Sequence, residues 1–139
     1  MESLKAKKQL IIAELEKFET KDERLKYIIE CGKNMPAMDP KLKMDHFLLQ
    51  GCISKAWLVP QFQDGRISFH ADSEAVIVKG IISLLLAVFN DSKPKDILED
   101  DGSFLSEVGI TDHLSMNRRN SSANIMKLIH YYADTFLKN

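Results

Sequence analysis

The spacing of hydrophobic and polar residues predicts helices at both ends of the chain and strands between them. Over residues 3–18, hydrophobic residues recur at helical spacing among lysines and glutamates, which is typical of an amphipathic helix. A second helix is expected to begin after Thr20, because Thr20 and Glu23 have the spacing of a capping box. Gly32 is expected to end that helix, since glycine commonly follows a helix C-terminus.

The middle of the chain predicts three short strands. A two-residue Asp64-Gly65 turn is a strong hairpin signal between the last two strands. In the third strand, Ile67 and Phe69 alternate with polar residues, as expected for a strand with one buried face. The expected strands cover residues 47–50, 55–62 and 66–72.

Helices return after the strands. Asp72 or Ser73 is expected to cap a long helix that runs to about Phe89, and its nearly continuous apolar surface predicts the central core helix. Further helices are expected at residues 95–99, 104–108 and 117–136. This order predicts a single domain over residues 1–139 with an α+β fold, in which a three-stranded antiparallel sheet packs against helices on one side.

The composition is ordinary for a soluble domain. Hydrophobic residues make up 45% and charged residues 28% of the 139 residues, which suits one domain with a single core. The formal net charge is −1, so no electrostatic argument favours nucleic acid as a partner. No apolar run is long enough to span a bilayer, and the first residues lack the pattern of a signal peptide. We therefore expect a cytoplasmic protein without membrane contact, and the two cysteines fit that reducing compartment.

Cys52 is the residue that most suggests chemistry. It follows Gly51 between two apolar, strand-like runs, which favours a turn on a rigid support, where binding and catalytic groups are common. A lone cysteine is also often a small hydrophobic residue of the core, so both readings stay open at this stage. Cys31, late in the second helix, is interpreted as structural or incidental. Cations favour the reactive thiolate, and the candidates are Lys55, Lys79, Arg118 and Arg119.

Other kinds of site find little support in the sequence. None of the four histidines has a spacing to Cys52 that fixes a Cys–His pair. The chain has neither the Cys-x-x-Cys nor the His-x-x-x-His pattern that is typical of zinc sites, and it has no glycine-rich phosphate loop. We therefore expect no metal site.

Three sequence blocks together resemble the SufE family. Residues 51–58 (GCISKAWL) are similar to the Gly-Cys-Gln-Ser-x-Val-Trp-Leu block of that family. Residues 71–80 (ADSEAVIVKG) resemble its Ala-Asp-Ser-Asp-Ala-x-Ile-Val-Lys-Gly block, and residues 114–120 (LSMNRRN) its Leu-Ser-Pro-Ser-Arg-x-Asn block. The retained residues are Cys52, Trp57, Asp72, Lys79 and Arg118; the departures are Ile53, Met116, Asn117 and Ser121. The departures concern partner affinity or loop detail, and the central thiol is kept.

The resemblance implies a sulfur acceptor. Such a protein takes persulfide sulfur from a SufS-type cysteine desulfurase onto the residue that matches Cys52, stimulates the desulfurase, and delivers sulfur to the SufBCD scaffold for iron–sulfur cluster assembly. It implies an accessory protein rather than an enzyme. The resemblance further implies that the protein has no cofactor of its own, because pyridoxal phosphate belongs to the desulfurase, and that the protein is a monomer or weak homodimer. The implied fold is shared with IscU-like scaffolds.

The resemblance also carries expectations for individual residues. Supporting or partner-contacting roles are implied for Gly51, Ser54, Asp72, Lys79 and Arg118. Arg118 is expected to steady the thiolate or contact the desulfurase, with a capping or surface role as the alternative. The Cys52 side chain is expected to rest against apolar residues and to swing out when the partner docks. The candidate walls are Leu49, Trp57 and the long helix.

Two competing functions remain open on sequence grounds. An iron–sulfur scaffold of IscU type needs several cysteines that converge on the cluster, whereas this chain has one in the relevant region. A stand-alone thiol enzyme needs a base near Cys52. Within the family, the SufE and the closely related CsdE branches are not distinguished.

Overall fold

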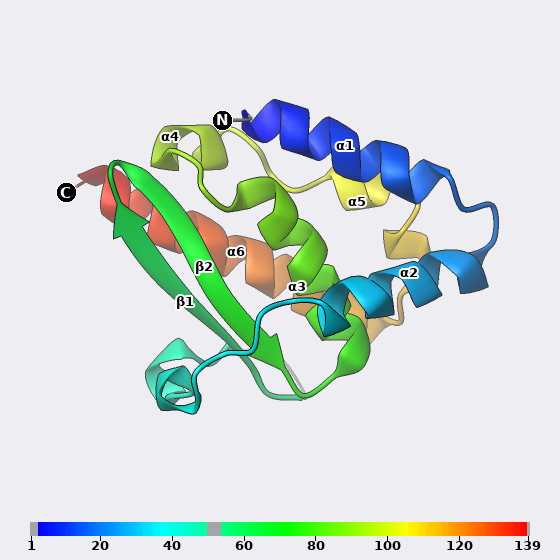
Figure 1. Cartoon of the computed structure of the whole chain (residues 1–139), viewed down its shortest axis with the longest axis horizontal. Coiled ribbons are helices and arrows are strands. Elements are labelled where there is room, and N and C mark those ends of the chain that lie inside the picture. The colour runs from blue at the N-terminus through cyan, green and yellow to red at the C-terminus, as the bar shows by residue number, and fades with distance from the viewer. Residues whose placement is uncertain (1–2, 50–53, 139) are drawn as a thin grey trace.

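The computed structural model describes residues 3–49 and 54–138, and it has the α+β character expected from the order of elements (Figure 1). The α-helices are α1 (Leu4–Glu16), α2 (Lys21–Lys33), α3 (Val76–Phe89), α4 (Pro94–Leu98), α5 (Phe104–Glu107) and α6 (Met116–Lys138). The strands are β1 (Ala56–Gln63) and β2 (Arg66–Ser73), and short 3-10 helices are η1 (Pro40–Leu42), η2 (Asp45–Phe47) and η3 (Thr111–His113).

The two strands form the predicted hairpin. They pair antiparallel from Gln63 opposite Arg66 to Ala56 opposite Ser73. Asp64 and Gly65 between them have φ angles of 53° and 76°. A two-residue hairpin turn that follows the right-handed twist of its strands needs positive φ at both positions, so the Asp-Gly prediction is confirmed.

The prediction of a third strand at residues 47–50 was wrong, as far as the described residues extend. Phe47 ends the 3-10 helix η2, and its amide donates to the carbonyl of Met44, so its backbone is used locally. Beyond it, Leu48 makes an isolated bridge with Trp57, and the Leu49 amide donates to the Ala56 carbonyl at 2.9 Å. Contact with β1 is therefore limited to this short stretch, and the sheet of the described chain has two strands.

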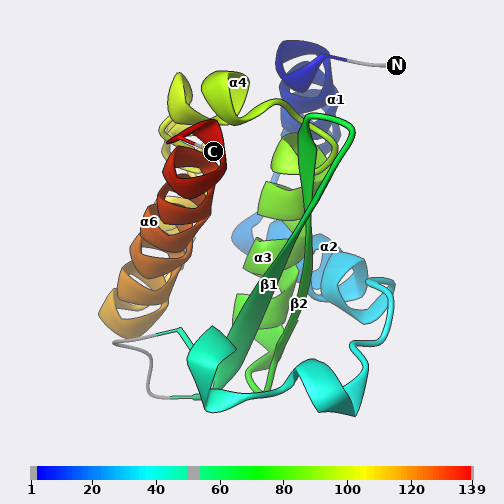
Figure 2. The same cartoon turned by 90° about the vertical axis from the view of Figure 1, so that its left-hand side faces the viewer.

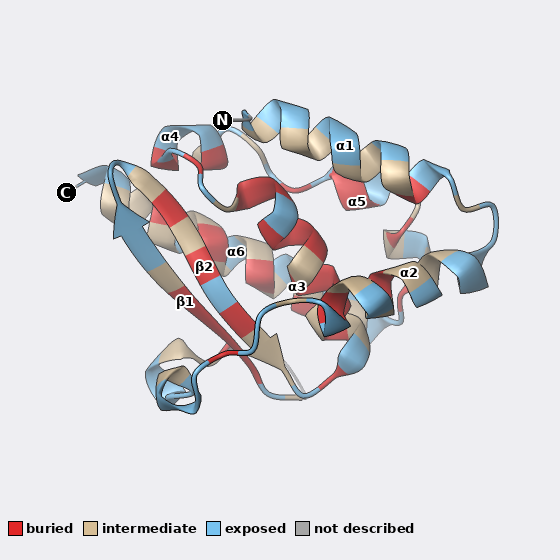
Figure 3. Ribbon diagram, in the orientation of Figure 1, coloured by how far each residue is buried: buried red, intermediate tan, exposed pale blue. Residues whose placement is uncertain are grey.

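Helix α3 is the central element, as its apolar sequence predicted. It lies behind the hairpin, with α6 on one side and α2 on the other (Figure 2). Buried positions follow most of its length (Figure 3). On β2, the alternating residues Ile67, Phe69 and Ala71 are buried in the same core. The α-helices therefore cover one face of the hairpin, in agreement with the predicted layering.

A second, smaller hydrophobic cluster lies near the open end of the hairpin, where β1 begins and β2 ends. We call this end the base of the hairpin. Trp57 and Val59 of β1 pack with Met38, and the cluster is completed by partly buried Leu42, Phe47 and Leu48. Most of these residues belong to the stretch between α2 and β1, which we call the η segment (residues 36–49). The η segment lies apart from the α-helices at the base of the hairpin (Figures 1 and 2). Apart from Leu49, which is buried in the main core, the η segment therefore packs on β1 through this small cluster.

Glycine at position 32 serves close helix packing, so the prediction that it ends α2 was wrong. The helix continues to Lys33, and Gly32 is buried inside it. An added Cβ at Gly32 would lie 2.7 Å from the backbone nitrogen of Gly80 in α3. An added Cβ at Gly80 would collide with the carbonyl oxygen of Ile28 and lie 2.6 Å from its Cγ2. Two glycines thus allow α2 and α3 to approach backbone to backbone.

The predicted helix caps were partly right. The Thr20 hydroxyl accepts a hydrogen bond from the Glu23 amide at 3.1 Å, as the capping box requires. For α3, however, the N-cap residue is Ala75, and no side chain caps it. The Ser73 hydroxyl accepts from the Ala75 amide at 3.1 Å, just before the helix begins. Asp72 is engaged elsewhere, as described below.

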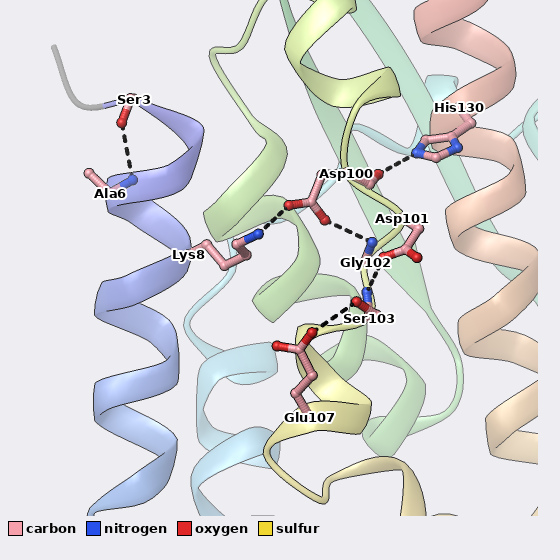
Figure 4. Close-up of polar contacts among 9 residues, drawn as sticks. All are labelled: Ser3, Ala6, Lys8, Asp100, Asp101, Gly102, Ser103, Glu107 and His130. Atoms are coloured by element: carbon pink, nitrogen blue, oxygen red, sulfur yellow. Dashed lines mark hydrogen bonds and ion pairs between the residues drawn. The ribbon is translucent and has the colours of Figure 1, made fainter.

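The loop between α4 and α5 joins two distant helices (Figure 4). The Asp100 carboxylate forms an ion pair with Lys8 of α1, with 2.6 Å between Oδ2 and Nζ. It also accepts a hydrogen bond from the Gly102 amide at 2.9 Å. The carbonyl oxygen of Asp100 lies 2.6 Å from Nε2 of His130 in α6. Because a carbonyl only accepts, the proton of this hydrogen bond is on Nε2. One short loop thereby connects α1 with α6.

We expect Gly80→Ala to lower the free energy of unfolding by about 2 kcal/mol or more, because the new methyl group overpacks the crossing with α2. Alanine is normally the better helix former by about 1 kcal/mol, so the sign itself is diagnostic. Urea unfolding measures the change. Gln9→Ala, at an exposed position of α1, is the control and should shift stability by less than about 0.5 kcal/mol. A neutral or stabilising Gly80→Ala would contradict the close crossing.

Candidate functional site

The predicted thiol, Cys52, lies outside the described residues, as do its neighbours Gly51 and Ile53. The described residues on both sides of this stretch are held at the base of the hairpin. Before it, the Leu49 amide donates to the Ala56 carbonyl. After it, the Lys55 carbonyl accepts from the Glu74 amide at 2.9 Å and from the Ser73 hydroxyl at 3.2 Å. Leu49 and Lys55, on the two sides of this stretch, therefore both lie where β1 begins and β2 ends. Of the predicted supporting residues, Ser54 is half-buried there.

Asp72 is the centre of the polar contacts at this end of the hairpin. Its Oδ2 lies 2.8 Å from Nζ of Lys43, and its Oδ1 lies 3.2 Å from Nζ of Lys79. Oδ1 also accepts a hydrogen bond from the Ser73 amide at 2.8 Å. The carboxylate thus connects the η segment, the end of β2 and the first turns of α3.

The charge of this cluster is set by two cations on one carboxylate. Burial by itself would raise the pKa of Asp72, but hydrogen bonds from Lys43, the Ser73 amide and Lys79, with the Lys79 charge, lower the pKa below its usual value of 3.8. Asp72 is therefore ionised at neutral pH, and the three side chains together carry one net positive charge. Their side chains are 17% to 34% exposed, so this charge is partly open to solvent.

Trp57 forms the floor of the cluster. It lies opposite Asp72 in the hairpin register and is 7% exposed. The ammonium of Lys43 lies 5.2 Å from the centroid of its ring, within the range of a cation–π interaction. Leu49, another of the three predicted apolar walls, is also buried, in the main core. Both walls are thus apolar and buried, while the expectation that Cys52 rests against them stays a prediction.

Arg118 and its neighbour Arg119 differ in their surroundings. The guanidinium of Arg119 donates from Nε to the carbonyls of Thr111 and Leu114, at 3.0 and 3.1 Å, and so holds the approach to α6. The backbone amide of Arg118 donates to the Ser115 hydroxyl at 3.3 Å. Within residues 3–49 and 54–138, no hydrogen bond or ion pair engages the Arg118 guanidinium, and none joins it to the Asp72 cluster.

Cys31 is half-buried on α2, in a setting that disfavours reaction. Burial raises the pKa of its thiol, and a hydrogen bond with Tyr27 opposes that effect only in part. The pKa of Tyr27 rises to about 12, mainly through burial and through its contact with Cys31. The Cys31 thiol is therefore protonated at neutral pH, and its interpretation as structural or incidental stays a prediction.

A cavity of about 790 Å³ lies away from the Asp72 cluster, between α1, α2, α3 and β2, and its lining includes Cys31, Phe69 and Ser83. None of Ser54, Asp72, Lys79 or Arg118 contributes to that lining.

In the described part of the chain, no group of three or more histidine, cysteine or acidic residues could hold a metal ion. No described helix is both long and apolar enough to cross a membrane.

Lys43 is the residue of this cluster that the sequence did not reveal. It lies far from Asp72 in the chain, in a stretch with two prolines and no clear hydrophobic period. Neither spacing nor residue type distinguishes it from other surface lysines. Its role emerges only when the η segment folds back onto the hairpin.

Comparisons with known proteins agree with the sequence resemblance. A family model described as "SufE: Fe-S metabolism associated domain" matches residues 9–133, and its description connects the chain with iron–sulfur metabolism. An uncharacterized SufE-like protein of Rhizobium meliloti is 30% identical over 118 residues, which cover 81% of this chain and 84% of that protein. An uncharacterized SufE-like protein of Synechocystis sp. is 29% identical over 113 residues, covering 81% and 71%.

A solved structure shares the fold. The solution structure of a hypothetical protein from Thermus thermophilus matches 98% of this chain and 96% of its own, with a TM-score of 0.76 and 16% sequence identity. At that identity the likeness concerns the fold alone.

We expect Asp72→Asn to lower the free energy of unfolding by about 1 kcal/mol near neutral pH, because it removes the charge that pairs with Lys43 and Lys79. The folded-state pKa of Asp72 is depressed, so its stabilisation is present above the unfolded-state pKa and is lost as pH falls through the folded-state value. The difference between variant and wild type should therefore shrink below about pH 4. Urea unfolding at several pH values measures it. Glu16→Gln, at an exposed position, is the control; a pH-independent deficit at Asp72 would contradict the ion pairing.

Proposed function

Because the chain belongs to the SufE family, we propose that it accepts sulfur as a persulfide on Cys52. The observation that carries the proposal is the family match over residues 9–133, together with the retained cysteine in its Gly-Cys-x-Ser context. The geometry of the flanking residues supports it. Leu49 and Lys55 are each anchored to the base of the hairpin, so the described chain on both sides of Cys52 lies on a rigid support.

The proposed reaction is a sulfur transfer between two thiols. The Cys52 thiolate attacks the terminal sulfur of a cysteine persulfide on the donor. A sulfur–sulfur bond forms on Cys52 while the donor sulfur–sulfur bond breaks, and the donor cysteine leaves as a thiolate. No oxidant or reductant is consumed. The donor we propose is a SufS-type cysteine desulfurase, which carries pyridoxal phosphate, and the recipient is the SufBCD scaffold.

The charge at the base of the hairpin suits this chemistry. The Asp72 cluster carries a net positive charge that is partly open to solvent. A thiolate and a donor persulfide are both anionic, and neighbouring cations favour such species. We propose that Lys79 and Asp72 support the site in this way and that the protein acts as an accessory to the desulfurase.

An iron–sulfur scaffold of IscU type is supported less well. Such a scaffold needs several thiolates around the cluster, and the second cysteine here, Cys31, has a raised thiol pKa and a tyrosine partner. A sulfur acceptor needs a single cysteine. The two functions can be separated by substituting the cysteines one at a time.

The decisive experiment is incubation with a cysteine desulfurase and cysteine, followed by mass spectrometry of the intact protein. We expect wild type and Cys31→Ser to gain one sulfur atom that a reductant removes, and Cys52→Ser to gain none. Wild type should also raise desulfurase turnover. If wild type stays unmodified and turnover is unchanged, the sulfur-acceptor proposal fails; loss of sulfur uptake in Cys31→Ser would point instead to a site that needs both cysteines.

The two neighbouring arginines offer a matched test of partner contact. Arg118→Ala should weaken stimulation of the desulfurase by about threefold to tenfold with little change in stability, since within the described chain its guanidinium has no partner to lose. Arg119→Ala should instead lower the free energy of unfolding by about 1 kcal/mol, because its two carbonyl hydrogen bonds are lost. Turnover assays and urea unfolding measure the two effects. Equal stimulation by wild type and Arg118→Ala would rule out the contact.

A further inference from the structure

Up to Leu48 the η segment is attached to the hairpin mainly through Trp57 and Asp72, whereas Leu49 is buried in the main core. Met38 packs on Trp57, and Leu48 forms a bridge with the same residue. Lys43 adds the polar attachment: one ammonium group lies 2.8 Å from the Asp72 carboxylate and 5.2 Å from the centre of the Trp57 ring. Lys43 thereby contacts both attachment points at once.

The position of Lys43 in the chain gives these contacts a consequence. The η segment ends at Leu49, whose amide bonds to Ala56, and Cys52 is the third residue after Leu49 in the sequence. The contacts of Lys43 therefore hold the stretch that leads to Leu49, next to the residues that carry the thiol. The apolar cluster around Trp57 is small, so the ion pair and the cation–π contact of Lys43 each add a modest contribution to the attachment.

We propose that Lys43 is a positioning residue for sulfur transfer: by bridging Asp72 and Trp57 it holds the η segment, which leads toward Cys52 in the sequence, in the arrangement from which sulfur is accepted. The proposal rests on the proposed function of Cys52. It differs from a partner contact because the ammonium is engaged inside the protein, on a buried ring and a carboxylate that is 17% exposed. Its effect is on the rate of transfer within the complex.

The test compares Lys43→Met with Lys43→Arg. Methionine keeps an unbranched apolar stem and removes the charge, whereas arginine keeps both the charge and the capacity to stack on an aromatic ring. The chain has a single tryptophan, so its fluorescence reports on Trp57 alone. Two quantities are measured for each variant: quenching of Trp57 by acrylamide, and the rate of sulfur transfer from the desulfurase to Cys52 over a range of desulfurase concentrations.

For Lys43→Met we expect more efficient quenching of Trp57 and a maximal transfer rate lower by about threefold to tenfold, with the half-saturating desulfurase concentration unchanged. Lys43→Arg should restore both quantities to near the wild-type values. Added salt should slow wild type toward the Lys43→Met rate but leave Lys43→Met itself less affected, since salt screens a partly exposed ion pair.

Three outcomes overturn the proposal. Unchanged quenching shows that Lys43 does not hold the η segment. Increased quenching with an unchanged maximal rate shows that the attachment does not govern transfer. A change confined to the half-saturating concentration identifies Lys43 as a partner contact. Failure of the proposed function is recognised separately, because wild type itself would then take up no sulfur, while the quenching measurement would still decide whether Lys43 holds the η segment.

Discussion

The close crossing of α2 and α3 is the constraint on which the rest of the structure depends. Gly32 and Gly80 leave no room for a side chain between the helices, so α3 lies deep against α2 and leaves its other side to the hairpin and α6. The backbone of Lys79 takes part in the same crossing, with its carbonyl carbon 3.0 Å from where a Cβ on Gly32 would be. The helix contact therefore also places the start of α3, from which Lys79 reaches Asp72.

A single carboxylate then assembles the candidate site. Asp72 is the last residue but one of β2, and its ion pairs draw together a helix and an irregular segment that share no direct sequence relation. Because two ammonium groups compensate one carboxylate, the assembly is stable as an ionised cluster and leaves positive charge over for an anionic reactant. The same interaction thus serves the fold and the chemistry proposed for Cys52.

Only some local signals were interpreted correctly from the sequence, and interactions between distant segments were not predicted at all. Thr20 and Asp64-Gly65 act on their immediate neighbours, so their patterns predicted a cap and a turn that the structure has. Gly32 was misread because helix termination and helix packing both favour glycine, and only the partner helix distinguishes them. The run at 47–50 predicted a strand because its residues are mostly apolar. The 3-10 geometry of Phe47 has no comparable signal in the sequence. For the Asp72 cluster, the family blocks pointed to Asp72 and Lys79, whereas Arg118 makes no described contact with it and nothing local marked Lys43.

The separation of the hydrophobic residues into two clusters implies two levels of protection against amide hydrogen exchange. The amides of α3 are covered by the main core, so they exchange only when the whole domain opens. Up to Leu48 the η segment is held by the small cluster around Trp57 and by one ion pair, so its amides are expected to exchange through a local opening that leaves the main core intact. The protein can thus rearrange the chain beside its candidate thiol without loosening the helices that support it.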